Sequence, residues 1–365
     1  MTIKTCVIGL GAMGRNHVRV QSDLPGAKLV GASDPSEAAR AAAAKSGLAV
    51  YDDYRRLFDT EKPDACIVSV PTEVHLPVAL EALSRGIHVL VEKPIAPTVA
   101  DAQKMIDAAK AANRVLMVGQ IERFNPAVQE LKRVVQAGEL GKIFQLHARR
   151  LSPFPARIQD VGVILDLATH DIDAMHFVTG SRVVRAFAET ARKAHKSCED
   201  LLSGLVRFES GEIGVLDVSW LSPLKLRQLS VVGEGGVVVA DYLAQDVVFY
   251  KNGKVNDSWE PASHFSGAVE GDMVKRHIAK KEPLRNEHEA FLRAVRGDEP
   301  VAVGGEDGLR ALQVALAFIE SGRSAALQTF SRSLAARPLM RIGGHAHGHY
   351  GLPVVCGCRR TRARP

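Results

Sequence analysis

The sequence lacks any window of about 18 consecutive apolar residues, which argues against a membrane-spanning helix. Its N-terminus lacks the basic segment and small-residue cleavage site of a secretory signal, so we expect no secretion. Cysteine is scarce. The five cysteines are odd in number and show no disulfide spacing, while Cys6 and Cys66 lie in apolar runs typical of buried thiols. This pattern favours the reducing cytoplasm.

Acidic residues and lysine are absent from residues 331–365, which hold seven of the 47 basic residues. The 40 basic residues of positions 1–330 therefore face 41 acidic ones, and the net charge of +6 belongs to the tail. A near-neutral body predicts neither a nucleic-acid nor a membrane partner. The tail is rich in Arg, Gly and His and has little periodicity, so we expect it to be disordered and assign it no metal site.

What remains is ordinary globular composition, with 46% hydrophobic and 24% charged residues. In residues 1–120, short β-branched runs alternate with helical stretches, which indicates βαβ units and a parallel sheet. In residues 121–330, strand-like runs joined by hairpin signals predict an α+β domain with a mostly antiparallel sheet. The expected organisation is thus an α/β protein of two domains followed by a tail at 331–365.

A glycine-rich loop follows the first apolar run. Gly9, Gly11 and Gly14 form a G-x-G-x-x-G pattern that leaves a strand and opens a helix, and Asp34 ends the next strand. This context is typical of a Rossmann dinucleotide-binding domain: the glycines allow a tight turn and close approach of the pyrophosphate, and the helix N-terminus binds phosphate. An acidic residue at Asp34 accepts ribose hydroxyls and repels a 2′-phosphate, which favours NAD over NADP. Ala12 and Met13 complete the predicted phosphate loop.

Two further features suggest proton chemistry. Lys93 follows a strand at the edge where parallel sheets bind ligands, although a surface lysine would look the same. Asp166 and His170 are spaced i and i+4, so we expect one helix face to carry both, with the carboxylate orienting the imidazole and stabilising its protonated form. A capping or surface role for these carboxylates stays open. A metal site with Asp171 or Asp173 is disfavoured, because no second His or Cys lies at ligand spacing.

Taken together, the motifs resemble the Gfo/Idh/MocA family of NAD(P)-dependent sugar and cyclitol oxidoreductases. The resemblance covers about residues 1–330 and implies a Rossmann domain followed by a domain with a large open sheet that commonly mediates homo-oligomers, here a dimer or tetramer. The motifs that carry it are the glycine loop, Asp34, Pro71-Thr72 with His75, Glu92-Lys93-Pro94, and Asp166-x-x-x-His170.

The resemblance also implies residue roles. Lys93 corresponds to the catalytic lysine, with a cis bond to Pro94, and His170 to the general base, with Asp166 as its companion; all three would contact substrate. The cofactor would be lined by Pro71, Thr72, His75, Glu92 and Gln120, with Glu92 beside the nicotinamide ribose.

A narrower resemblance lies in residues 118–127 and 152–164. Both segments are similar to the branch of the family that oxidises UDP-N-acetylglucosamine at C3. The resulting keto sugar nucleotide is a substrate for a PLP-dependent aminotransferase and leads to lipid A with an amide-linked acyl chain. Gln120 departs from this branch, where histidine is common.

A UDP-sugar carries a diphosphate, which guanidinium groups bind well. The candidate phosphate ligands are Arg123, Arg149 and Arg157, and Asn125 is a candidate for bonding the sugar, its N-acetyl group or the nicotinamide carboxamide. Two alternatives stay open: an inositol or other sugar dehydrogenase of the same family, and an NAD-binding regulator without turnover.

Overall fold

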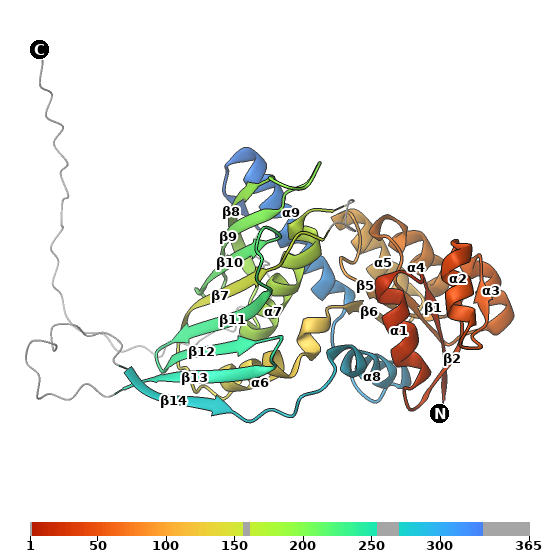
Figure 1. Ribbon diagram of the computed structural model, residues 1–365, viewed down its shortest axis with the longest axis horizontal. Coiled ribbons are helices and arrows are strands. Elements are labelled where there is room, and N and C mark those ends of the chain that lie inside the picture. Colours follow the sequence, from red (N-terminus) through yellow and green to blue (C-terminus); the bar gives the residue numbers. More distant parts are fainter. Residues whose placement is uncertain (1, 156–160, 254–269, 331–365) are drawn as a thin grey trace, which may run out of the picture. The chain divides into compact units, whose positions relative to one another are not determined.

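The computed structural model describes residues 2–155, 161–253 and 270–330, and residues 1–330 form one compact unit. The predicted tail, with its two cysteines, lies outside the described residues. Within them, no helix is both long and apolar enough to cross a membrane. Figure 1 shows two sheets, each accompanied by helices.

The first sheet has six parallel strands in the order β3-β2-β1-β4-β5-β6. Its strands are β1 (Ile3–Ile8), β2 (Ala27–Ser33), β3 (Val50–Tyr51), β4 (Ala65–Val68), β5 (His88–Glu92) and β6 (Leu116–Gly119). The helices between them are α1 (Ala12–Ser22), α2 (Glu37–Ala44), α3 (Tyr54–Glu61), α4 (His75–Ser84) and α5 (Val99–Ala111). The strand order reverses between β1 and β4, which places a ligand crevice at their carboxyl ends.

The second sheet has nine strands in the order β14-β13-β12-β11-β7-β10-β9-β8-β15, and β7 with β10 is its parallel pair. The strands are β7 (Ile143–Leu151), β8 (Val183–Ala191), β9 (Leu201–Phe208), β10 (Ile213–Ser219), β11 (Leu226–Gly233), β12 (Gly236–Asp241), β13 (Asp246–Asn252), β14 (Glu270–Arg276) and β15 (Gln328–Thr329). The helices α6 (Pro126–Gln136), α7 (Thr169–Thr179) and α9 (Gly305–Ser324) pack against it. The predicted Rossmann domain and mostly antiparallel second sheet are confirmed.

Two helices late in the chain return to the first sheet. Helix α8 (Pro283–Arg296) packs against α1, and α9 packs against α5 and β6. Phe291 of α8 and Leu312 of α9 belong to the same apolar core as β1 and β4. Helices α8 and α9 therefore help to build the Rossmann half, although the first sheet itself ends at Gly119.

Candidate active site

The glycine loop has the geometry of a phosphate cradle. Gly9 has φ = +91°, and a Cβ on Gly14 would lie 1.9 Å from the carbonyl oxygen of Gly9. A side chain would therefore disrupt the turn at Gly9 or the packing at Gly14. A Cβ on Gly11 would meet no atom within 4 Å, so open space lies in front of the N-terminus of α1. Ala12 and Met13 begin this helix, whose first N–H groups can face a phosphate.

Asp34 lies just beyond β2, beside the glycine loop. Its carboxylate accepts hydrogen bonds from the main-chain N–H of Leu10 at 2.7 Å and of Ser36 at 2.8 Å. The side chain is half-buried, and a carboxylate has more lone pairs than these two bonds use. The carboxylate is thus held in place with capacity left for ribose hydroxyls. The open cradle at Gly11 and the fixed Asp34 fit NAD.

Lys93 follows β5 and reaches the turn that precedes α7. Its Nζ donates to the carbonyl oxygen of Asp166 at 2.5 Å and to the carboxylate at 3.1 Å. Asp166 lies in a single π-helical turn, Ile164–Ala168, that leads into α7. The ammonium group is thereby fixed between the two halves of the protein, and the Lys93–Pro94 bond is cis.

His170 lies at the start of α7, close to this pair. Burial lowers the pKa of His170 well below its ordinary value, and the positive charges of Lys93, Arg150 and Arg227 lower it further. Its Nδ1 has no hydrogen-bond partner among the described residues. The expectation that Asp166 orients His170 and stabilises its protonated form is wrong, because the carboxylate of Asp166 is bound to Lys93 and the charges that shift His170 are cationic. The result is a neutral imidazole, the state that a general base requires.

The predicted cofactor residues that follow β4 lie at the carboxyl-terminal edge of the first sheet and differ in their burial. Pro71 and Thr72 lie near the surface just after β4. His75 is buried with its ring nitrogens 3.0 Å from the carbonyl oxygen of Val70 and 3.1 Å from that of Pro94. Burial lowers the pKa of His75. The expected direct contact of His75 with cofactor is not supported, since both nitrogens face protein carbonyls and tie the two segments together.

Glu92 is the last residue of β5, and Gln120 directly follows the neighbouring strand β6. The carboxylate of Glu92 is only 12% exposed and accepts a hydrogen bond from the main-chain N–H of Lys93. Gln120 is buried, and its Oε1 has no hydrogen-bond partner within the described chain. This edge of the sheet therefore holds a buried acceptor without a donor in the described chain.

Two of the predicted substrate ligands have partners within the protein. Arg123 is buried and forms two 2.6 Å hydrogen bonds with Asp173, and a further ion pair with Asp307. Asn125 caps α6 through Oδ1, and its Nδ2 donates to the carbonyl oxygen of Tyr242. In this structure the polar groups of Arg123 and Asn125 are bound within the protein, which gives both side chains structural contacts, and their contact with substrate stays a prediction.

Arg149, another predicted phosphate ligand, lies on the face of the second sheet that is turned away from the candidate site. It is exposed on β7 and lies 3.6 Å from Asp217 of β10, whereas its neighbour Arg150 is buried toward the helices. Successive side chains of a strand point to opposite faces, so Arg149 points away from His170 and α7. The predicted ligand Arg157 lies outside the described residues.

The arginine that does reach this region is Arg227, which the sequence analysis missed. It stands opposite Arg150 across β11 and β7, and directly paired residues share a face. Arg150 is buried and bound to Asp171 and Glu122, but the nearest acidic atom of Arg227 is 3.7 Å away, on Glu122. Burial and the charge of Arg150 lower the pKa of Arg227. Arg227 is thus a cation with a weak protein partner and a partly exposed side chain.

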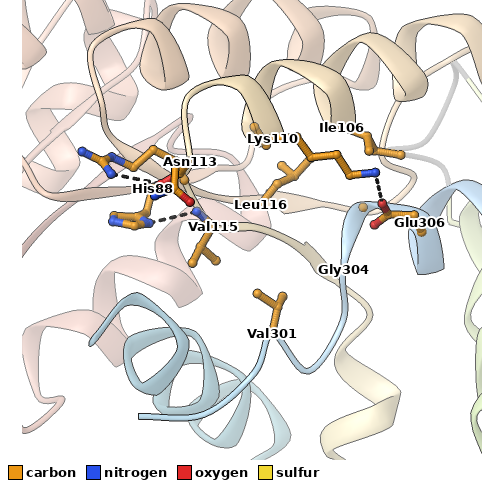
Figure 2. A pocket seen from close by; sticks show the side chains of 12 residues that line it. His88, Ile106, Lys110, Asn113, Val115, Leu116, Val301, Gly304 and Glu306 are labelled. Atoms are coloured by element: carbon orange, nitrogen blue, oxygen red, sulfur yellow. Dashed lines mark hydrogen bonds and ion pairs between the residues drawn. The ribbon is translucent and has the colours of Figure 1, made fainter. Parts of the chain in front are cut away.

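A separate cavity of about 450 Å³ lies at the amino-terminal ends of β5 and β6 (Figure 2). It is lined by His88, Leu116, Val301 and Gly304, and by Lys110 paired to Glu306 at 2.6 Å. None of the predicted site residues lines it. The candidate active site is therefore at the opposite, carboxyl-terminal edge of the first sheet.

The Rossmann sheet, its open cradle and the Lys93–His170 pair define an NAD-binding oxidoreductase. Residues 3–120 match the family model described as oxidoreductase family, NAD-binding Rossmann fold, and residues 128–239 match the GFO/IDH/MocA C-terminal domain. The chain belongs to the Gfo/Idh/MocA family.

Similar proteins in this family act on more than one kind of substrate. The UDP-N-acetylglucosamine 3-dehydrogenase of Acidithiobacillus ferrooxidans is 30% identical over 86% of this chain and 95% of its own length. Its solved structure has a TM-score of 0.78 and covers 89% of this chain and 99% of its own. The myo-inositol 2-dehydrogenase of Thermotoga maritima is 28% identical over 88% of this chain and 98% of its own length. The chain is therefore similar to sugar and inositol dehydrogenases along nearly its whole described part.

Proposed function

We propose that this protein oxidises the C3 hydroxyl of UDP-N-acetylglucosamine with NAD. The observation that carries the chemistry is the neutral His170 beside the fixed ammonium of Lys93, at the NAD edge of the first sheet. The similarity to a UDP-N-acetylglucosamine 3-dehydrogenase supports the choice of substrate. Arg227 supports an anionic substrate, because its guanidinium has capacity for phosphate oxygens.

When bound at this edge, NAD would supply the acceptor for the hydride that leaves C3 of the sugar. His170 takes the hydroxyl proton on a ring nitrogen, so the C3–OH becomes a ketone and the imidazole becomes an imidazolium. Lys93 donates a hydrogen bond to the same oxygen and stabilises its developing negative charge. Asp166 holds the lysine ammonium in position for this contact.

The wider setting is part of the same proposal. A keto sugar nucleotide is a substrate for a PLP-dependent aminotransferase, and the amino sugar would enter lipid A-type biosynthesis in the cytoplasm. A homo-oligomer formed through the open sheet is proposed from the family resemblance.

The deciding experiment follows absorbance at 340 nm after purified protein is mixed with NAD and UDP-N-acetylglucosamine. A partner aminotransferase with glutamate removes the keto product, so that an unfavourable equilibrium does not hide NADH. NADH formation with this substrate but not with myo-inositol or glucose supports the proposal. NADH with myo-inositol alone supports the inositol dehydrogenase alternative, which the similarity to a myo-inositol 2-dehydrogenase favours. NAD binding without turnover of any sugar supports the regulator.

A further inference from the structure

A buried chain of hydrogen bonds runs from the interior of the Rossmann half to Glu92. Glu92 Oε1 lies 2.9 Å from His17 Nε2, and His17 Nδ1 lies 2.8 Å from His288 Nε2. His288 Nδ1 lies 2.5 Å from Gln21 Nε2, and Gln21 Oε1 accepts from Thr5 at 2.9 Å. His17 and Gln21 belong to α1, and His288 belongs to α8. The chain therefore joins β5 to helices that are far apart in sequence.

The donor and the acceptor of each hydrogen bond in this chain can be identified in turn. Thr5 donates to Gln21, and the amide of Gln21 donates to Nδ1 of His288. Burial lowers the pKa of His288 well below its ordinary value, so the ring is neutral and its single proton must lie on Nε2, facing His17. Nδ1 of His17 accepts this bond, and Nε2–H of His17 donates to Glu92. All donors point toward one carboxylate.

The ionised form of Glu92 is disfavoured by burial, so it depends on hydrogen-bond donors and positive charge nearby. Burial alone would raise the pKa of Glu92, but the interaction with His17, through its hydrogen bond first and its charge second, and then the charge of Lys93 bring the pKa below its ordinary value. The pKa of the neighbouring Glu287 shifts the other way: burial and the charge of Glu92 raise it well above its ordinary value. Neither carboxylate oxygen of Glu287 has a hydrogen-bond partner in the described chain. The pKa values of the two carboxyls are therefore shifted in opposite directions, and His17 contacts the carboxyl whose ionised form is favoured.

The second oxygen of Glu92 is fixed at the active site. Oε2 accepts from the main-chain N–H of Lys93 at 3.1 Å, at the edge where NAD binds. We propose that His17 and His288 are positioning residues, which hold Glu92 oriented toward the NAD site and so couple α8 to the Lys93 backbone. The hydrogen-bond partners of His288 in the described chain are His17 and Gln21, so His288 acts on Glu92 through His17.

The pH dependence of NAD binding follows from this arrangement. The titratable groups around Glu92 are His17 from α1, His75 from α4, Lys93, and Glu287 with His288 from α8. Without the donated bond, burial dominates and the pKa of Glu92 rises. An ionised carboxylate favours the cationic ring of NAD+ over the uncharged ring of NADH. Loss of the donor should therefore weaken NAD+ binding as the pH falls, at pH values where the unmodified protein still binds.

The test compares two variants of His288. His288→Phe removes the donor to His17 Nδ1 that keeps the proton of His17 on Nε2, facing Glu92, and His288→Gln has an amide that restores a donor near the position of His288 Nε2. The dissociation constants of NAD+ and NADH are measured between pH 5 and 8 by titration calorimetry, without substrate. We expect His288→Phe to weaken NAD+ binding by about tenfold at the acidic end, with a smaller change for NADH and recovery in His288→Gln. His176→Phe is the control, because His176 is similarly buried in α7 and packs beside Phe208.

The proposal is overturned if His288→Phe lowers only the melting temperature, as the control does, and leaves the pH dependence of NAD+ binding unchanged. Should His288→Phe fail to fold, Gln21→Leu replaces it, because it removes the donor to His288 Nδ1 and keeps the imidazole. A shift in the same direction supports the proposal, and an unchanged pH dependence overturns it. Since no sugar is present, the result is independent of the proposed substrate.

Discussion

The ammonium group of Lys93 donates to both the carbonyl oxygen and the carboxylate of Asp166, at 2.5 and 3.1 Å. This pairing separates the roles of two residues that are spaced i and i+4. Asp166 fixes the lysine, and the buried Nδ1 of His170 has no hydrogen-bond partner in the part of the chain that the structure describes. The pKa of His170, the proposed catalytic base, is therefore lowered by burial and by nearby cations, and Asp166 is not its hydrogen-bond partner.

Replacing Asp166 tests this separation. In Asp166→Asn, the carbonyl contact of Lys93 remains but the ion pair is lost. We expect kcat with the proposed substrate to fall by about 10- to 100-fold, in the range of a positioned hydrogen bond to a charged group. The acidic limb of the kcat/KM profile should stay close to its original position. A large shift of that limb would mean that Asp166 sets the protonation of His170.

The lowered pKa of His170 predicts the pH at which kcat/KM declines on the acidic side of the profile. Burial and three neighbouring cations lower its pKa well below the ordinary value of about 6.5, so the imidazole stays neutral, and active as a base, below that pH. We therefore expect kcat/KM to be retained as the pH falls through about 6.5, and to decline only at more acidic values. The profile is measured by initial rates of NADH formation across a buffer series.

Removing the imidazole is the matching mutation. His170→Asn should lower kcat by about 10²- to 10⁴-fold, the usual range for loss of a general base. Binding of NAD, followed by calorimetry, should change little, because the ring nitrogens contact no group of the glycine loop. A variant with near-normal turnover would contradict the assignment of His170 as the base.

Arg227 makes a prediction about substrate binding. Arg227→Met keeps the apolar length of the side chain and removes the charge, so KM for UDP-N-acetylglucosamine should rise by about 10- to 100-fold, with a smaller change in kcat. Arg149→Met is the matched control, since Arg149 lies on the neighbouring strand and points to the other face. Equal effects of the two substitutions would show that Arg227 has no special contact with substrate.

The contrast among these arginines shows what sequence can predict. Alternation along 143–151 indicates a strand and says that Arg149 and Arg150 face opposite sides, but it does not say which side the helices cover. The G-x-G-x-x-G loop is local and recognisable, whereas His17 and His288 meet across 271 positions of the chain. The fold class and NAD loop could therefore be predicted from local patterns. The burial of Arg123 and the exposure of Arg227 depend on tertiary partners that no local pattern encodes.

Asp34 gives the last prediction, which concerns cofactor choice. Its carboxylate is fixed by the N–H groups of Leu10 and Ser36 and faces the end of β2, where the adenosine ribose lies in a Rossmann domain. A 2′-phosphate placed there would meet a negative charge, and no cationic side chain of the described residues is bound to that carboxylate. Arg40 is close, since its Nη1 donates to the carbonyl oxygens of Asp34 and Pro35 at 2.8 Å.

In Asp34→Ser, the repulsion disappears, a hydroxyl replaces the acceptor, and Arg40 remains near the new phosphate. We expect the ratio of kcat/KM for NAD to that for NADP to fall by at least about tenfold, mostly through weaker NAD use and measurable NADP use. Arg40→Met in the same background should remove the gain with NADP while leaving activity with NAD unchanged. A ratio that stays constant in Asp34→Ser would mean that the cofactor is selected at the phosphate loop, and that Asp34 only braces Leu10.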